Sequence, residues 1–447
     1  MKVEEADLLQ RLASPARKLV ELCGRIASER GEAAFLVGGT ARDLVLGRVQ
    51  ADLDVVVEGD GMAVAQALAR AIGGQLTRYH TFQTARVDTK DGYRIDLSTA
   101  RSEAYPRPGQ LPQVVAGSLQ DDLLRRDFTI NALAISLDPT HGGELIDPCH
   151  GLEDLQGGVI RALHGRSFAD DATRILRALR FARRLDYRLD RQTDRWLREA
   201  VAGGYLDTVS GNRIQREIAY LFTEFPVEGP VLLARYGVLE AIHTRLRADE
   251  KSLRALADVA AWYGRVERQH TEDATRSACG ADWGMVLAVC AEQLSPQQRW
   301  ALVKRLRLSR SERRALIESG APWLKVYRAW KRVRSIALPT AGAVERLFRP
   351  LSAPALQVVL ATCLEADESE LVAALRGYLE TYQWLRPRLT GQELLQMGLG
   401  EGPQVGKVLD FLLAARLEGR ATSLEAERQL VMKWLAGSQD PPEGGER

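Results

Sequence analysis

The segment from Phe35 to Val57 constrains the fold of this 447-residue chain more than any other. It reads FLVGGTARDLVLGRVQADLDVVV, in which one apolar run ends in two glycines and a second apolar run closes the segment. This order predicts a strand at Phe35–Val37, a glycine turn, a helix to about Leu46 and a second strand at Asp52–Val57. Further strands alternate with helices over roughly the first 140 residues, which indicates a small α/β or α+β head domain.

Two carboxylates, Asp52 and Asp54, stand at the start of the second strand. Side chains two residues apart on a strand lie on one face, so both carboxylates point to one place while Leu53 turns into the core. Mg²⁺ binds one or two carboxylates together with the phosphates of a substrate. The preceding Gly38 and Gly39 allow a backbone to approach a phosphate closely. Together these residues predict a catalytic site for nucleotidyl transfer, in which Asp52 and Asp54 hold Mg²⁺.

The composition argues against several other classes of protein. The net charge is only +2, so any nucleic-acid surface has to come from local clustering of charge. The five cysteines are scattered without C-x-x-C spacing, which argues against a zinc site or a disulfide framework and for a reducing cytosol. No run of eighteen apolar residues occurs, and the N-terminal MKVEEADLLQRL lacks the apolar core of a signal peptide. We therefore expect a cytoplasmic protein with no membrane partner.

A third carboxylate is a candidate for the same site. The predicted elements around it are a helix from Glu5 to Arg30 that Pro15 divides, a helix at Gly61–Ile72, and strands at Gln75–Tyr79, Thr84–Asp88 and Tyr93–Ser98. Asp96 lies on the last of these strands and would face the same metal ions. The alternative is a solvated acid at a strand edge.

The segment DDLLRRDFTINALA, residues 121–134, is dense in polar side chains just ahead of an apolar run. Arg125 and Arg126 could reach the oxygens of a triphosphate. Asp127 and Asn131 could hold a ribose hydroxyl, or they could lock the arginines in place. The plain alternative is a surface helix cap with a salt bridge.

A basic helix is predicted from Asp170 onward, in the sequence DDATRILRALRFARR. Acids at its start suit the positive end of the helix dipole. Arginines then follow at three- and four-residue steps, at Arg174, Arg177, Arg180 and Arg184. The plain alternative is a capped amphipathic helix with an Asp171–Arg174 ion pair, which would contribute only a few tenths of a kcal/mol.

A functional interpretation of this helix rests on hydrogen-bond patterns. Arginine offers only donors and an ionised aspartate only acceptors. Cytosine and adenine each present a ring-nitrogen acceptor beside an exocyclic amino donor, whereas uracil and guanine present the reverse order. Asp171 with Arg174 would therefore select CTP and ATP without a nucleic-acid template. Arg177 and Arg180 would face the phosphates or stack near the nucleotide.

Taken together, these motifs resemble those of the class II transfer-RNA nucleotidyltransferase family, the bacterial CCA-adding enzymes and bacterial poly(A) polymerases. The matching pieces, in family order, are LVGGTARDLVLGRVQADLDVVV, IDLSTARSE, DLLRRDFTINALA, IDPCHGLEDLQGGVIRAL, DDATRILRALRFARRL and GNRIQREIAYLF. The C-terminal LTGQELLQMGLGEGPQVGKVLDFLLAARLEGRATSLEAE also resembles the tail of many members. The match covers most of the chain and is weakest from about residue 230 to residue 385.

The resemblance implies an enzyme that extends the 3′ end of transfer RNA from CTP and ATP. The RNA 3′-hydroxyl would attack the α-phosphorus in line, with metal ions stabilising the attacking and leaving oxygens. It implies that Asp52 and Asp54 bind the catalytic Mg²⁺ and that Asp96 helps to activate the attacking hydroxyl. The implied nucleotide contacts are Gly38, Gly39 and Arg42, Arg126 at phosphate, Asp127 and Asn131 near ribose, and Asp171, Arg174, Arg177 and Arg180 in the pocket.

Two departures from the family pattern bear on which nucleotides are added. Asp170-Asp171 replaces the usual Glu-Asp, with a shorter reach at Asp170. The segment from Arg101 to Pro112 is rich in proline and glycine, which predicts a loop, either mobile beside the active site or an inert connector. Its Pro-Gly-Gln-Leu-Pro looks more like branches that add only part of the end, notably A-adding enzymes. CC-adding enzymes, poly(A) polymerases and an inactive RNA-binding homologue are the remaining alternatives.

The expected fold class is α+β, with a polymerase-β-like head and helical domains after it. The expected divisions are a head at 1–155, a neck at 156–225, a body at 226–335, an RNA-binding tail at 336–438 and a disordered end at 439–447. In the tail, Gly398, Gly400 and Gly402 precede a helix that contains Lys407. They predict either a site for an RNA phosphate or a tight turn between helices.

Overall fold

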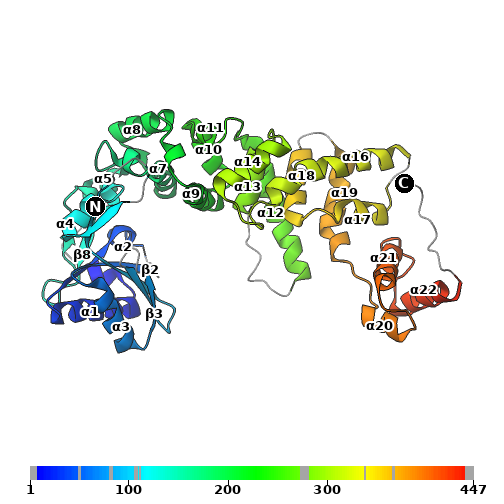
Figure 1. Cartoon of the computed structure of the whole chain (residues 1–447), viewed down its shortest axis with the longest axis horizontal. Coiled ribbons are helices and arrows are strands. Elements are labelled where there is room, and N and C mark those ends of the chain that lie inside the picture. Colours follow the sequence, from blue (N-terminus) through cyan, green and yellow to red (C-terminus); the bar gives the residue numbers. More distant parts are fainter. Residues whose placement is uncertain are drawn as a thin grey trace. The chain divides into compact units, whose positions relative to one another are not determined.

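The computed structural model describes residues 8–48, 52–79, 84–104, 109, 112–271, 281–336, 339–364 and 368–437. The chain divides into two compact units, one of residues 1–217 and 236–242 and the other of residues 218–235 and 243–447. Within the described residues, the strands belong to the first unit and the second unit is helical (Figure 1). The finer division into head, neck, body and tail stays a prediction, and residues 439–447 lie outside the described residues.

One mixed sheet organises the first unit. Its strand order is β3-β4-β5-β2-β1-β8-β9, in which β2 and β5 are parallel and the other neighbours antiparallel. The strands are β1 (Ala33–Val37), β2 (Asp52–Glu58), β3 (Gln75–Tyr79), β4 (Thr84–Asp88), β5 (Arg94–Thr99), β8 (Ala134–Ser136) and β9 (Leu145–Ile146). Two further pairs join β6 (Arg101–Ala104) to β7 (Gln113–Ala116) and β10 (Val159–Ile160) to β11 (Arg188–Leu189). The predicted α+β class is confirmed.

Helices α1 and α3 pack together on one side of this sheet (Figure 1). Pro15 lies in the first turn of α1, where its missing N–H is not needed. Asp60 caps α3 by accepting from the Ala63 backbone N–H, and Gly73 ends α3 in the left-handed conformation. The helices of the first unit are η1 (Leu8–Arg11), α1 (Ser14–Glu29), α2 (Gly38–Val45), α3 (Gly61–Ile72), α4 (Leu119–Leu124), η3 (Thr129–Asn131), α5 (Gly151–Gly157), α6 (Ser167–Asp170), α7 (Thr173–Leu185), α8 (Arg191–Ala202), η4 (Tyr205–Thr208) and α11 (Val238–Ile242); the division between units falls within α9 (Gly211–Glu224).

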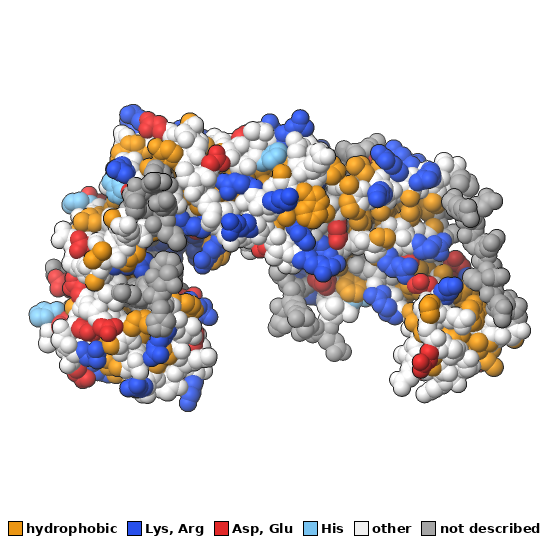
Figure 2. Space-filling model, in the orientation of Figure 1, with side chains coloured by type: hydrophobic (Ala, Val, Ile, Leu, Met, Phe, Trp, Pro, Cys, Tyr) orange, Lys and Arg blue, Asp and Glu red, His pale blue; other side chains and the backbone are white. Residues whose placement is uncertain are grey.

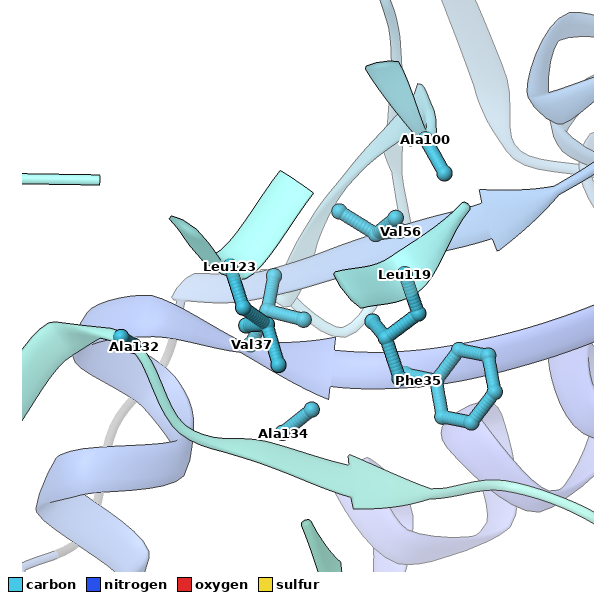
Figure 3. Close-up of a cluster of buried hydrophobic side chains, with 8 residues drawn as sticks. All are labelled: Phe35, Val37, Val56, Ala100, Leu119, Leu123, Ala132 and Ala134. Carbon is cyan, nitrogen blue, oxygen red and sulfur yellow. The ribbon is translucent and has the colours of Figure 1, made fainter. Parts of the chain in front are cut away.

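Helix α4 packs against the sheet through a buried apolar cluster (Figure 3). Leu119 and Leu123 of α4 meet Phe35 and Val37 of β1 and Val56 of β2. Leu123 is fully buried, so truncating it to Ala would remove about 2–5 kcal/mol of stability. This packing fixes the position of the turn that follows α4.

The face of β2 that contributes Val56 to this cluster also carries two polar side chains. Because strand side chains alternate, Asp52 and Asp54 share that face, while Leu53 and Val55 are buried on the other. The face is therefore covered by α4 at one end of the strand and open at the other. The predicted orientation of the two carboxylates and of Leu53 follows from this alternation.

The second unit is built from helices among the described residues. They are α10 (Glu228–Arg235), α12 (Glu250–His270), α13 (Trp283–Cys290), α14 (Pro296–Leu306), α15 (Arg314–Glu318), α16 (Ala321–Ile336), α17 (Ala341–Phe348), α18 (Ala353–Cys363), α19 (Ser369–Glu380), η5 (Tyr382–Trp384), α20 (Gly391–Gln396), α21 (Pro403–Leu417) and α22 (Leu424–Gly437). Figure 2 shows Lys and Arg side chains spread over this unit. As predicted, a glycine turn leads into α21, and Gly402 is the residue directly before this helix.

Two local predictions are wrong. Arg101–Ala104, expected in a loop, forms strand β6, because each of its residues pairs with one of Gln113–Ala116. Asp171 does not open a helix, since α6 ends at Asp170, Asp171 is extended and α7 begins at Thr173. Residues 105–108, 110 and 111 of the predicted loop lie outside the described residues. Across the described chain, none of the helices combines the length and apolar character needed to span a bilayer.

Candidate active site

A polar cavity of about 590 Å³ opens in the first unit, where β1 leads into α2. Every catalytic or nucleotide-binding residue predicted from the sequence lines it except Asp96. Its walls come from α2, β2, the turn after α4, η3 and α7. Residues expected in the head and in the neck thus meet in one site.

The Asp52 and Asp54 side chains lie at this cavity on the open face of β2. The Thr40 hydroxyl accepts from the Asp54 backbone N–H at 3.0 Å and donates to the Asp52 carbonyl at 3.4 Å, which ties the strand to α2. Asp52 is 68% exposed, and Arg94 Nη1 lies 3.6 Å from its carboxylate. The cavity walls desolvate Asp54 and the neighbouring Asp96 repels its charge, and both effects raise the pKa of Asp54.

The donor chemistry of this pair fits a hard divalent cation. Among the described residues, no cation forms an ion pair with Asp54. Across the same residues, no three His, Cys, Asp or Glu side chains form a group that could hold a metal ion by themselves. A cation at Asp52 and Asp54 therefore needs water or substrate oxygens to complete its coordination, which is the usual situation of Mg²⁺.

Asp96 lies beside the cavity, engaged by an arginine that the sequence did not indicate. The strand register aligns Arg86 of β4, Asp96 of β5 and Asp54 of β2 in one row. Arg86 donates from Nε and Nη2 to the two Asp96 oxygens at 2.8 and 2.9 Å, which raises the pKa of Arg86 above its usual range. The candidate third carboxylate is next to Asp54, and each of its oxygens accepts one hydrogen bond from Arg86.

The glycine turn faces an arginine with an unused donor. Gly38 has φ +64°, and a Cβ added there would lie 2.6 Å from Arg126 Nη1. Arg126 Nη2 donates to Asp122 Oδ2 at 2.7 Å, while its buried Nε has no hydrogen-bond partner within the described chain. Helix α2 also begins at Gly38 without a side-chain cap. A buried orphan donor beside an uncapped helix N-terminus is an arrangement that suits an anion.

We expect Gly38→Ala to lower the free energy of unfolding by about 1–2 kcal/mol, because a Cβ is strained at this positive φ. The added Cβ also displaces Arg126, so binding of tripolyphosphate should weaken. Gly47→Ala is the matched control, since Gly47 has φ +70° with nothing within 4 Å of an added Cβ. Urea denaturation should show similar losses for both variants, and calorimetry should show weaker tripolyphosphate binding for Gly38→Ala alone. Equal anion binding by both variants would contradict the assignment.

Asp127 and Asn131 hold two of the cavity arginines. Asp127 is buried, and its Oδ2 accepts from Arg177 Nε and Nη2 at 2.8 and 2.6 Å. Asn131 donates to Asp127 Oδ1 at 2.9 Å and accepts from Arg42 Nη1 at 2.8 Å. Burial alone would raise the pKa of Asp127, but Arg177 and the Asn131 hydrogen bond outweigh it and lower the pKa to about 2. Of the two roles considered for these residues, the contacts support locking the arginines.

Phe181 gathers three guanidinium groups at the cavity wall. The Arg42, Arg177 and Arg180 guanidinium carbons lie 5.2, 5.3 and 5.0 Å from the centre of its ring. Contacts of this kind contribute about 0.5–2 kcal/mol each. Glu217 adds an ion pair to Arg180 at 3.2 Å and one to Arg177 at 3.7 Å. These arginines therefore have fixed positions before any ligand binds.

Asp171 keeps limited acceptor capacity toward the cavity. Its Oδ1 accepts from the Thr173 backbone N–H and hydroxyl at 3.0 and 2.7 Å, and its Oδ2 accepts from Arg213 at 2.6 Å. The ion pair with Arg174 that the plain alternative supposed is not formed, and Arg213 pairs with Asp171 instead. An ionised carboxylate oxygen has two acceptor positions, so Oδ2 can still accept one more hydrogen bond.

Arg174 is buried in the cavity wall and bound to neutral groups. Its Nη1 donates to Ser167 Oγ at 2.8 Å, and its Nη2 donates to the Arg125 carbonyl at 2.7 Å. A guanidinium has five N–H donors in a fixed fork, so three remain for a ligand beside Asp171. Both side chains line the same cavity.

Several residues that organise the site were not identified from the sequence. Asp122 could have been found, because it stands four residues before Arg126 on one helical turn. Phe181 could also have been found, because it stands four residues after Arg177 on α7. Arg86, Arg213 and Glu217 hold groups on other elements, and no spacing rule connects them. The residues in question are Arg86, Asp122, Phe181, Arg213 and Glu217.

Comparison with known proteins gives several similarities. Residues 34–161 match the family described as the Poly A polymerase head domain. A protein of Geobacter sulfurreducens named A-adding tRNA nucleotidyltransferase is 31% identical over 439 residues, which cover 96% of this chain and 48% of that protein. A second protein of that organism, named CC-adding tRNA nucleotidyltransferase, is 30% identical over 450 residues, which cover 96% of this chain and 97% of that protein.

A solved structure extends the similarity to three dimensions. It is described as the Thermotoga maritima CCA-adding enzyme complexed with tRNA, and it matches with a TM-score of 0.70 and 30% identity over 96% of this chain and 97% of that one. The chain spans about half the length of the A-adding relatives that it matches.

Proposed function

The chain belongs to the tRNA nucleotidyltransferase family, and we propose that it adds CMP, AMP or both to the 3′ end of transfer RNA. CTP and ATP are the donors in this proposal, and the protein itself takes the place of a template. The observation that carries it is the composition of one cavity. Two strand carboxylates, an arginine with an orphaned donor, and the Asp171 and Arg174 side chains line the same space.

The triphosphate of the incoming nucleotide is proposed to lie against Arg126 and the start of α2. The free Nε of Arg126 and the uncapped N–H groups after Gly38 and Gly39 offer donors to phosphate oxygens. Arg177 and Arg180, held by Asp127 and Glu217, add positive charge along the same wall. These groups bind and orient the phosphates.

Nucleotidyltransferases of this family generally use divalent metal ions, and we propose Mg²⁺ at Asp52 and Asp54. The two carboxylates supply hard oxygen ligands, and the α-phosphate of the nucleotide would supply another. When bound, the ion stabilises the negative charge that develops on the attacking and leaving oxygens.

The transfer is an in-line displacement in this proposal. The 3′-oxygen of the RNA forms a bond to the α-phosphorus while the bond from that phosphorus to the bridging oxygen of the β-phosphate breaks. Pyrophosphate leaves with the electron pair of that bond, and the hydroxyl proton passes to water. The role of the protein is to align the two reacting groups and to hold the triphosphate. A direct role of Asp96 in activating the hydroxyl would use the acceptor position that each of its oxygens keeps beside the Arg86 hydrogen bond.

Base selection rests on Asp171 and Arg174. The remaining acceptor position of Asp171 Oδ2 suits an exocyclic amino group, and the remaining Arg174 donors suit a ring nitrogen. Uracil and guanine would place donor against donor and acceptor against acceptor, so they are rejected.

We expect Arg174→Ala to reduce discrimination against UTP and GTP by about 10–100-fold, the loss expected for one hydrogen bond that involves a charged group. The measurement is the ratio of kcat/KM for CTP or ATP to that for UTP or GTP. Arg183→Ala is the control, because Arg183 lies on the same helix but does not line the cavity. Discrimination that is unchanged in Arg174→Ala would refute the base-reading assignment.

The function is tested by incorporation on three purified transfer RNAs, ending before the first C, after CC and after CCA, with each labelled nucleotide supplied separately. CMP on the first and AMP on the second would establish complete CCA addition. AMP on the CC-ended RNA alone would establish an A-adding enzyme, and CMP alone a CC-adding enzyme. Long AMP tails on any RNA would indicate a poly(A) polymerase, and no incorporation would refute the proposal.

An A-adding specialist is the second candidate. It is favoured by the Pro-Gly-Gln-Leu-Pro sequence between Arg107 and Gln113, which resembles branches that add part of the CCA end.

The reducing cytosol is the proposed compartment of this protein. Four cysteines are free thiols in the described chain, in keeping with that proposal: Cys23, Cys149, Cys290 and Cys363.

A further inference from the structure

In-line transfer fixes the side from which the RNA has to reach the site, an argument that rests on the proposed function. Gly38 and Gly39 directly follow β1 and Arg126 lies against Gly38, so the groups assigned to the triphosphate are on the β1 side of β2. The attacking oxygen stands on the opposite side of the α-phosphorus from the leaving pyrophosphate. In the sheet order, β5 and β4 occupy that opposite side of β2. The RNA end therefore meets side chains of β5 and β4.

These strands present a second row of charged side chains beside the Arg86–Asp96 pair. The register aligns Asp88 of β4, Arg94 of β5 and Asp52 of β2. Arg94 Nε lies 3.3 Å from Asp88 Oδ1, and Arg94 Nη1 lies 3.6 Å from Asp52 Oδ1, so the three side chains share the open face of the sheet. This row is adjacent to the catalytic carboxylates, and its cation lies on the proposed RNA side.

The two arginines of this face are held differently. Arg86 makes a bidentate ion pair with Asp96, with hydrogen bonds of 2.8 and 2.9 Å. Both contacts of Arg94 are longer, and the Arg94 side chain is 46% exposed. Its partners, Asp88 and Asp52, face Nε and Nη1, so at most two of the five N–H donors of the guanidinium are engaged. Arg94 then has donors free for another anion, and its planar fork matches two oxygens of a phosphate.

We propose that Arg94 binds the phosphodiester linking the last two nucleotides of the RNA acceptor, with the Arg86–Asp96 pair as the fixed wall of that subsite. The terminal base of the acceptor changes as nucleotides are added, and its phosphodiester does not. A phosphate contact positions the chain without reading sequence. Such a subsite would hold successive acceptor ends in the same place.

The test measures RNA binding with Mg²⁺ and without nucleotide, so that no transfer occurs. The probe is an RNA hairpin with a single-stranded CC end, carrying either a natural or a methylphosphonate last linkage, and fluorescence anisotropy gives the dissociation constant. Arg94→Gln should weaken binding of the natural probe about tenfold and lower the slope of log affinity against log salt by about 0.7. The methylphosphonate, which lacks the charge, should weaken wild-type binding similarly and weaken the variant no further.

Lys90→Gln is the matched control, since it removes one positive charge from the turn between β4 and β5 away from this face. It should keep both the wild-type affinity and the sensitivity to methylphosphonate. In turnover, Arg94→Gln should raise the KM for RNA and leave the KM for the nucleotide unchanged.

The subsite would be overturned if Arg94→Gln and the methylphosphonate each weakened RNA binding and the two losses added when combined. The proposed function would remain intact in that case. A failure of the proposed function looks different, because the wild-type protein would then incorporate no nucleotide on any of the three transfer RNAs.

Discussion

Replacing Asp54 with Asn should lower kcat by about 1,000-fold or more and leave the affinity for RNA within about twofold of the wild-type value. Charge stabilisation at the reacting oxygens is worth several kcal/mol, and each tenfold change in rate corresponds to about 1.4 kcal/mol. The carboxylate lies at the cavity without an ion-pair partner among the described residues, so its loss should not unfold the domain. Asp52→Asn should behave in the same way. Single-turnover kinetics at saturating nucleotide and RNA measure the effect.

Asp91→Asn is the control for this experiment, because Asp91 is an exposed carboxylate on the turn after β4. It should retain the wild-type kcat. An Asp54→Asn protein that transfers nucleotides at the wild-type rate would exclude Asp54 as a metal ligand. Loss of RNA binding together with turnover would show instead that the substitution disturbs the fold.

Replacing Asp127 with Asn should lower the free energy of unfolding by about 3 kcal/mol at pH 7, because breaking a buried ion pair leaves a charge uncompensated. The value lies at the lower end of the usual range, since Arg177 retains Glu217 at 3.7 Å. Urea denaturation measures the change. Asp194→Asn is the control, because the Asp194–Arg198 pair lies at the surface one helical turn apart and contributes about 0.5 kcal/mol.

The difference between wild type and Asp127→Asn should also depend on pH. The pKa of Asp127 is about 2 in the folded protein, below the ordinary value near 3.9 in the unfolded chain. A carboxylate with a lowered folded-state pKa stabilises the fold fully above its unfolded pKa and loses that contribution as the pH falls through the folded value. The difference should be constant above about pH 5 and shrink between about pH 4 and pH 2. A difference that does not shrink in acid would argue against this ion pair as its source.

Period-two and helical spacings predicted much of the site. The alternation in Asp52-Leu53-Asp54 put two carboxylates on one strand face, and the structure places both at the cavity. The steps between Arg174, Arg177 and Arg180 placed all three on one side of α7, where they line the same space. Such rules work because they depend only on the local geometry of one element.

Contacts between elements could not be read from these spacings. Arg86 holds Asp96 because β4 and β5 pair in one register, and Arg213 holds Asp171 across 42 positions of sequence. The Asp171–Arg174 ion pair of the plain alternative is absent for a related reason, since the chain is extended at Asp171 and the helical spacing does not apply there. Arg101–Ala104 became a strand because a partner, Gln113–Ala116, was available beyond the proline-rich segment.

The alternation along β2 limits how descendants of this chain can vary in length. Val56 packs beneath α4 while Asp54 and Asp52, on the same face, carry the proposed chemistry. Deleting a single codon within the strand would turn every later side chain to the other face, so catalytic and core positions would exchange at once. Insertions and deletions in related genes should therefore be absent from β2 and from its parallel neighbour β5, and they should concentrate in the turns between strands. An inventory of gaps across many natural sequences would test this expectation without any biochemistry.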